Sequence, residues 1–223
     1  TEGIIKDIIP VNPSKIVQTY VHSPLIWGIH VDANSPYNSI EDLKNTKAAI
    51  SRMGSGSHLM AYINAEKHHW DTKSLEFEIV GDIEGAIKAL SEDTAQYFMW
   101  ERFTTKPLVD KGVFRRVGDC PTPWPCFVIA VREEVLENQK EAVREMLKVI
   151  NTKTISFKEI PGIEELLAKR YNQKLEDIKE WLDITSWSES QLTSEEIDNI
   201  QNNLLKLNLI PKKSPISKLI YNL

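Results

Sequence analysis

The segment SRMGSGSH, residues 51–58, combines the residue types that bind small anions. It follows an apolar run and precedes a helical pattern, so it lies where the unpaired N–H groups and the positive end of a helix dipole gather. Glycines let the backbone approach a ligand, serines offer hydroxyls, and arginine offers a planar cation. The candidate ligand residues are Ser51, Arg52, Gly54, Ser55, Gly56, Ser57 and His58. A carboxylate, a sulfonate or a phosphate fits this chemistry.

This segment differs from both common nucleotide-binding loops. A Walker loop requires a lysine before a serine or threonine, and the segment has no such pair. The dinucleotide fingerprint requires a third glycine, whereas His58 and Leu59 follow Ser57. The alternative to a ligand loop is a plain strand-to-helix turn with Ser57 as its cap.

Two tryptophans and one acid are further candidates. Trp100 and Glu101 end the strand pattern at 95–100, and ligands of α/β proteins sit at the carboxyl ends of strands. Trp100 offers a stacking face and Glu101 an acceptor, although a core tryptophan and a helix-start acid would have the same pattern. Alternating prolines stiffen residues 118–127 around Trp124, which this segment presents as an aromatic contact.

The cysteines and acids give no sign of a catalytic or metal centre. Cys120 and Cys126 are interpreted as two small buried apolar side chains, with a disulfide as the alternative that their spacing allows. A zinc site is not expected, because there is no second cysteine pair and no nearby histidine. No Ser-His-Asp signature or carboxylate pair stands out. We therefore expect no catalytic residue, no metal and no cofactor.

Alternating strand and helix patterns position these residues. Strand patterns cover 14–21, 25–31, 47–51, 75–80, 95–100, 113–118 and 126–131. Helix patterns cover 1–9, 38–44, 57–68, 82–92 and 103–112, and after residue 132 they cover 134–157, 162–171, 174–184 and 193–207. This order predicts an α/β fold with mainly parallel sheets and helices on both faces.

The composition argues against nucleic acid as a partner and against a membrane-spanning segment. The 223 residues carry a net charge of −5 with dispersed Lys and Arg, which argues against a nucleic-acid surface. No stretch is apolar enough to span a bilayer, and no signal peptide is visible. The chain opens at Thr1 on a helix pattern with no strand before it. Since a βαβ protein opens with a strand, we expect earlier strands to be missing and one lobe to be incomplete.

Three stretches resemble one known family. SIEDLKNTKAAISRMGSGSHLMAY, which contains the candidate loop, resembles type II periplasmic-binding-protein-like folds, and in particular the group that binds sulfonates, taurine and thiamine pyrimidines. TAQYFMWERFTTKPLVDKG matches a segment of that group at Trp100 and Glu101, and CFVIAVREEVLENQKEAVREMLKVI resembles its returning strand and long helix. The run DCPTPWPCFVIAV is similar to a narrower family of bacterial substrate-binding proteins and eukaryotic relatives. The resemblance covers residues 1 to about 185.

The resemblance implies two α/β lobes that close on a ligand in an interlobe cleft. Lobe 2 would run over 28–124, and lobe 1, which is partial, over 1–27 plus 125–223. It adds ligand contacts from the crossing segments at Trp27 and Trp124, beside the loop and Trp100 with Glu101.

The function that the resemblance implies is capture of a small anionic or zwitterionic solute, sulfonate-like or thiamine-pyrimidine-like, for an ABC permease. Such a protein would be periplasmic or lipid-anchored, and a cytoplasmic place stays open. One alternative is an enzyme like the fungal thiamine-pyrimidine synthases, which use their own histidine and pyridoxal phosphate, although their cysteine-rich motif is missing from this chain. The other alternative is a solute-sensing regulatory protein.

Overall fold

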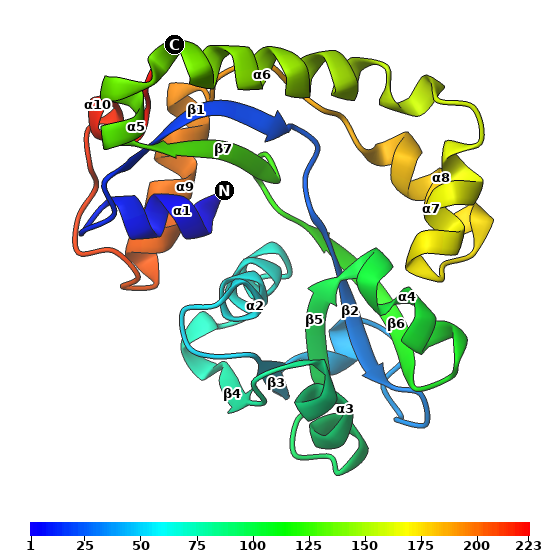
Figure 1. Cartoon of the computed structure of the whole chain (residues 1–223). Helices are drawn as coiled ribbons and strands as arrows, with labels where there is room; N and C mark the ends of the chain where they lie inside the picture. Colours follow the sequence, from blue (N-terminus) through cyan, green and yellow to red (C-terminus); the bar gives the residue numbers. More distant parts are fainter. The chain divides into compact units, whose positions relative to one another are not determined.

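The chain folds into two compact units, which the computed structural model describes over all residues 1–223 (Figure 1). Unit 1 consists of residues 1–24 and 123–223, and unit 2 consists of residues 25–122. Trp27, which we expected at the end of the first part of lobe 1, lies in unit 2, and Trp124, which we expected at the end of lobe 2, lies in unit 1. No helix in either unit has both the length and the apolar character that a membrane crossing requires.

Unit 2 is built on a five-stranded sheet in the order β4-β3-β5-β2-β6. The strands are β2 (Ile26–Asp32), β3 (Lys47–Ile50), β4 (Glu76–Ile79), β5 (Tyr97–Glu101) and β6 (Phe114–Pro121). The helices are α2 (Gly56–Lys67), α3 (Ile83–Ser91) and α4 (Arg102–Asp110), with short 3-10 turns η1 (Glu41–Leu43) and η2 (Thr72–Ser74). The predicted α/β class is confirmed.

The sheet of unit 2 is mixed, so the expectation of mainly parallel sheets is wrong. β3 runs parallel to β4 and β5, whereas β2 runs antiparallel to both β5 and β6. β2 is the strand on which the chain enters the unit, and β6 is the strand on which it leaves. Their antiparallel pairing returns the chain to the side from which it came.

The two faces of this sheet carry two separate hydrophobic cores. On the α2 face, Trp27, Ile50 and Tyr97 pack against one another and against Met60 and Ala61 of the helix. The other face places Phe98 and Phe114 against the alanines of α3. The helices are held at their N-termini by side-chain caps, from Ser55 on α2, Asp82 on α3 and Glu101 on α4.

Asn64 is a polar residue of α2 that is fully buried, and neither polar atom of its amide has a partner within the protein. We therefore expect Asn64→Ala to raise the free energy of unfolding by about 1–2 kcal/mol, because an unpaired buried polar group costs about 1–3 kcal/mol and alanine favours the helix. Urea denaturation measures this. Asn64→Asp, which buries a charge at the same position, should destabilise the protein, and a loss of stability in Asn64→Ala would contradict the prediction.

Unit 1 combines a two-stranded antiparallel sheet with most of the helices. Its strands are β1 (Ser14–Val21) and β7 (Phe127–Arg132). Its helices are α1 (Glu2–Ile8), α5 (Glu133–Asn138), α6 (Lys140–Ile155), α7 (Ile163–Tyr171), α8 (Leu175–Ile184), α9 (Ser194–Lys206) and α10 (Ile216–Leu219), with the 3-10 turn η3 (Phe157–Glu159). One core joins β1 and β7 to α5 and α6, and a second joins α7 to α8.

Two predicted helices differ from the structure. At 38–44 the chain forms a tight turn with only three 3-10 residues, because the Asp42 carboxylate accepts hydrogen bonds from the N–H groups of Asn38 and Ser39. The long helix at 134–157 is two helices, α5 and α6, which meet at Gln139 with φ −137° and ψ 34°.

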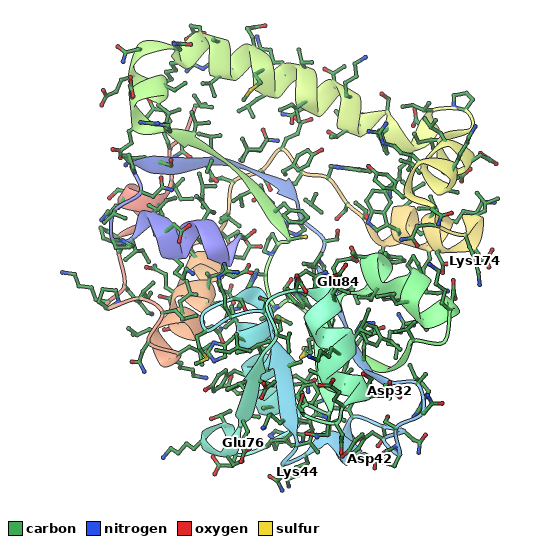
Figure 2. All side chains as sticks on the ribbon, turned by 60° about the horizontal axis from the view of Figure 1, so that its bottom comes forward. Asp32, Asp42, Lys44, Glu76, Glu84 and Lys174 are labelled. Carbon is green, nitrogen blue, oxygen red and sulfur yellow. The ribbon has the colours of Figure 1, made fainter.

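Charged side chains such as Asp42 and Glu76 are exposed on the surface of unit 2 (Figure 2).

Candidate anion-binding site

The loop 51–55 is held in one conformation by its own side chains. The Ser55 hydroxyl caps α2 by accepting from the N–H of His58 at 3.3 Å. The Ser57 hydroxyl accepts from the N–H of Ser51 at 3.0 Å and lies 3.0 Å from the Ser55 hydroxyl. Gly54 adopts a left-handed φ of 74°, which a glycine accommodates without strain. The plain-turn alternative named Ser57 as the cap, whereas Ser55 has this role and the Ser57 hydroxyl accepts from Ser51 after β3.

These contacts leave two backbone donors of α2 open. The N–H groups of Gly56 and Ser57 are the first two of the helix, and no protein atom accepts from either of them. Arg52, in the same loop, is exposed. The positive end of the helix dipole acts at the same position. The loop can therefore offer an anion two main-chain donors and a neighbouring guanidinium group.

Trp27 and Trp100 lie beside this helix start. A β-carbon at Gly56 would be 2.8–2.9 Å from the edge of the Trp27 ring, so the ring packs directly on the glycine. Trp27 in turn meets Trp100 edge to face, with ring centroids 6.2 Å apart, and Trp100 stacks on Phe98 at 5.4 Å. The structure thus brings together three of the predicted elements, the serine-glycine loop, Trp27 and Trp100. The Trp27 indole N–H is buried and has no partner within the protein.

His58 belongs to the framework of the loop. Its Nδ1 accepts a hydrogen bond from the N–H of Gly54 at 3.2 Å, and its ring packs edge-on against Tyr62 and Phe77. Burial lowers the pKa of His58, so the neutral form is favoured near neutral pH. This side chain shapes the loop, and direct contact with a ligand stays a prediction.

Glu101 is occupied locally. Its carboxylate accepts from the N–H groups of Phe103 and Thr104, at 3.0 and 2.7 Å, and from the Thr104 hydroxyl at 2.6 Å. It therefore acts as the helix-start acid that the sequence offered as the alternative. The adjacent Arg102 pairs with Asp119 of β6 at 3.5 Å, a contact that no spacing in the sequence indicates.

Trp124 lies in unit 1, where it is buried and donates its indole N–H to Glu2 at 2.9 Å. Cys120 and Cys126 are both buried and do not form a disulfide, as expected for small core residues. Burial raises the pKa of the Cys120 thiol to about 11, so the thiol is protonated at neutral pH and a poor nucleophile. No group of three or more His, Cys, Asp or Glu side chains is arranged for a metal ion.

Known structures share this architecture over nearly the whole chain. A Candida albicans protein, the CA3427 gene product described as having the generic periplasmic binding protein fold, superposes with a TM-score of 0.79 at 20% identity, covering 99% of this chain and 77% of the other. This is the periplasmic-binding-protein fold. A family profile described as Ca3427-like PBP matches residues 27–120, which corresponds to unit 2 almost entirely.

Other solved structures also match over nearly the whole chain. The alkanesulfonate-binding protein SsuA from Xanthomonas axonopodis pv. citri, bound to MOPS, gives a TM-score of 0.79 at 14% identity, covering 99% of this chain and 78% of the other. The desulfurization enzyme DSZB also matches, with a TM-score of 0.63 at 9% identity, covering 98% of this chain and 81% of the other. No curated protein sequence matches the chain. The fold is therefore shared by binding proteins and by an enzyme.

Proposed function

We propose that this chain is a solute-binding protein whose loop 51–58 binds the anionic group of a small organic solute. The observation that carries the proposal is the pair of open N–H groups of Gly56 and Ser57 at the start of α2. A negatively charged group placed there receives two main-chain hydrogen bonds and the favourable end of the helix dipole. Arg52 adds a charge-assisted hydrogen bond, which is about twice as strong as a neutral one.

The solute class that we propose is a sulfonate or a related anion or zwitterion, with a thiamine-pyrimidine-like compound as the second choice. Support for the first choice comes from the SsuA proteins, which bind sulfonates on the same fold. A sulfonate group has three acceptor oxygens, which suits a site with several hydrogen-bond donors. Trp100, which is half-buried and packs against Trp27, offers apolar area for the organic part of the solute. We also propose that the protein delivers this solute to an ABC permease.

Isothermal titration calorimetry tests the proposal directly. The panel consists of MOPS, ethanesulfonate, taurine, acetate, inorganic phosphate and a hydroxymethylpyrimidine. We expect heat of binding with at least one organic anion and a rise in melting temperature at saturating concentration. The absence of heat from every compound, together with an unchanged melting curve, would sink the proposal.

Arg52→Ala is expected to weaken binding of the anionic ligand by about 1.5–3 kcal/mol, the range for hydrogen bonds to charged groups, which is roughly a 10- to 150-fold loss of affinity. Stability should hardly change, because Arg52 is exposed. Arg52→Lys, which keeps the charge and loses the planar fork, should give an intermediate affinity. Equal affinity of all three proteins would mean that the loop is only a turn.

The enzymatic alternative assigns a bound pyridoxal-type cofactor to the protein. It predicts a lysine or histidine within reach of the cofactor aldehyde and a visible absorption band after reconstitution. A colourless protein after incubation with pyridoxal phosphate would remove this alternative. The regulatory alternative predicts the same ligand binding without a permease, so the genes beside this one distinguish the sensor from the transporter component.

A further inference from the structure

Unit 1 contains a groove that the proposed anion site does not use. It has a volume of about 330 Å³ and is lined by the end of α6, by Lys158 of η3 and by residues 185–189, which connect α8 to α9. Figure 1 shows this connection as an extended segment between α8 and α9. The volume is in the lower range of small-ligand pockets, about 300–1,000 Å³, so it suits a short ligand and not a folded partner.

One wall of the groove is the extended segment 185–189, whose backbone is hydrogen-bonded to another segment along one edge only. Ser188 donates its N–H to Tyr20 of β1 at 3.0 Å, and Ser186 accepts from His22 at 2.8 Å. These two bonds flank Trp187, which lies opposite Val21 in an antiparallel bridge. In such a non-hydrogen-bonded pair, the N–H and C=O of the central residue point away from the partner strand.

The opposite edge of the segment is therefore open at Trp187. Neither its N–H nor its C=O has a partner within the protein, and both face away from β1. A backbone donor and acceptor on the same residue form the pair to which an added strand bonds. The Trp187 side chain is fixed by aromatic contacts with Phe157 and Trp181, so this edge is presented by an ordered residue.

The groove carries apolar surface and two opposite charges. Ile155 is 72% exposed, which is unusual for a large aliphatic side chain and provides apolar contact in the groove. The Lys158 ammonium lies 5.8 Å above the Trp187 ring, and Glu189 contributes a carboxylate. Both side chains are exposed. A ligand with an acidic and a basic group on either side of an apolar group would match this charge pattern.

We propose that this groove binds a short extended peptide, which adds to the open edge at Trp187 as a strand. The central peptide residue exchanges two hydrogen bonds with the N–H and C=O of Trp187. Its apolar side chain lies on the same face as the Trp187 ring, against Ile155. The peptide residues two positions away on either side share this face, and they place an acid near Lys158 and a base near Glu189. Main-chain bonds supply the affinity in this mode, and the flanking side chains supply the selectivity.

The probe for this site is the blocked pentapeptide acetyl-Lys-Ala-Val-Ala-Glu-amide, whose first, third and fifth side chains share one face of a strand. It is titrated into the isotope-labelled protein and followed by amide chemical shifts. We expect saturable shifts at the amides of Trp187 and Glu189, with a dissociation constant of about 1 mM or below, as for weak peptide contacts. The analogue with N-methylvaline at the centre cannot donate its central hydrogen bond and should bind at least about tenfold more weakly. Equal binding of the two peptides would overturn the strand-addition mode.

Charge variants complete the test. Lys158→Glu should weaken the pentapeptide about three- to tenfold, which corresponds to loss and reversal of one exposed charge contact. Lys153→Glu is the matched control, because Lys153 is an exposed lysine of α6 that does not line the groove. Shifts that are absent up to about 10 mM peptide, or an equal effect of the two variants, would refute the site. The anion-binding proposal is independent of this outcome, since its residues lie in unit 2.

Discussion

Lowering the pH from 6.5 to 4 is expected to reduce the free energy of unfolding by about 3 kcal/mol through His30 alone, because burial lowers the pKa of this side chain from 6.5 to about 4. In this interval the unfolded chain binds a proton at His30, whereas the folded protein does not. The contribution of His30 is therefore complete above pH 6.5, decreases as the pH falls, and changes no further below pH 4.

The surroundings of His30 explain why the neutral ring is preferred. The ring is fully buried, with Nδ1 3.3 Å from the carbonyl oxygen of Phe98 and Nε2 2.8 Å from the Thr105 hydroxyl. Since a carbonyl only accepts, Nδ1 carries the proton and Nε2 accepts from Thr105. The charge of Arg116 adds to the effect of burial. A β-carbon at Gly28 would lie 2.6 Å from the ring, so the glycine makes room for this histidine.

Urea denaturation at pH 7 and pH 4.5 measures the loss, and His30→Gln isolates it from the carboxylates. Glutamine can donate to Phe98 and accept from Thr105 without titrating. We expect the variant to be less stable at pH 7 but to lose less stability than the original protein between the two values. Parallel curves for the two proteins would show that His30 does not control the acid response.

Trp27→Ala is expected to lower the free energy of unfolding by about 3–5 kcal/mol, the usual cost of removing a large buried aromatic side chain. Trp27 is 8% exposed and contacts both the core on the α2 face and Gly56 at the start of α2. Its loss removes the surface on which the helix start packs. Ligand affinity should fall together with stability, because the donors of Gly56 and Ser57 lose their support.

Trp27→Phe separates packing from hydrogen bonding. Phenylalanine keeps an aromatic ring in the core and removes an indole N–H that has no partner within the protein. The smaller ring lowers the free energy of unfolding, whereas removal of the unpaired donor raises it. The free energy of unfolding should therefore change by about 1 kcal/mol or less. If affinity for the solute falls while stability is kept, the indole N–H contacts the ligand. A collapse of stability in Trp27→Phe would contradict the packing account.

Apart from the helix expected at 38–44, the sequence predicted the strands and helices of unit 2, because each has its own local signal. The strand at β3 and the helix at α2 differ in hydrophobic period, and the loop between them has serines and glycines that cap and turn the chain. The direction of the strands has no such signal. Alternation identifies β2 as a strand but does not say whether its neighbours run parallel, so the mixed sheet was missed.

The candidate site was predictable only in part. Residues 51–57 were recognisable because their chemistry is contiguous in the sequence, and the structure shows which of their donors stay open. The contact of Trp27 with Gly56 joins residues far apart in the chain, so no local pattern reports it. The sequence predicts His58 as one of the ligand residues of the loop, whereas in the structure its ring packs against Tyr62 and Phe77.

Two hydrogen bonds join the first and last residues of unit 2, and this pairing has a practical consequence. Leu25 donates its N–H to the Thr122 hydroxyl at 3.0 Å, and Thr122 returns a main-chain bond to Leu25 at the same distance. Unit 2 is therefore an insertion whose first and last residues are adjacent, the geometry that tolerates excision and circular permutation. Residues 25–122 can therefore be inserted as one segment, together with the loop 51–58, into another scaffold or fused to a reporter protein. The insertion site needs only two adjacent chain ends.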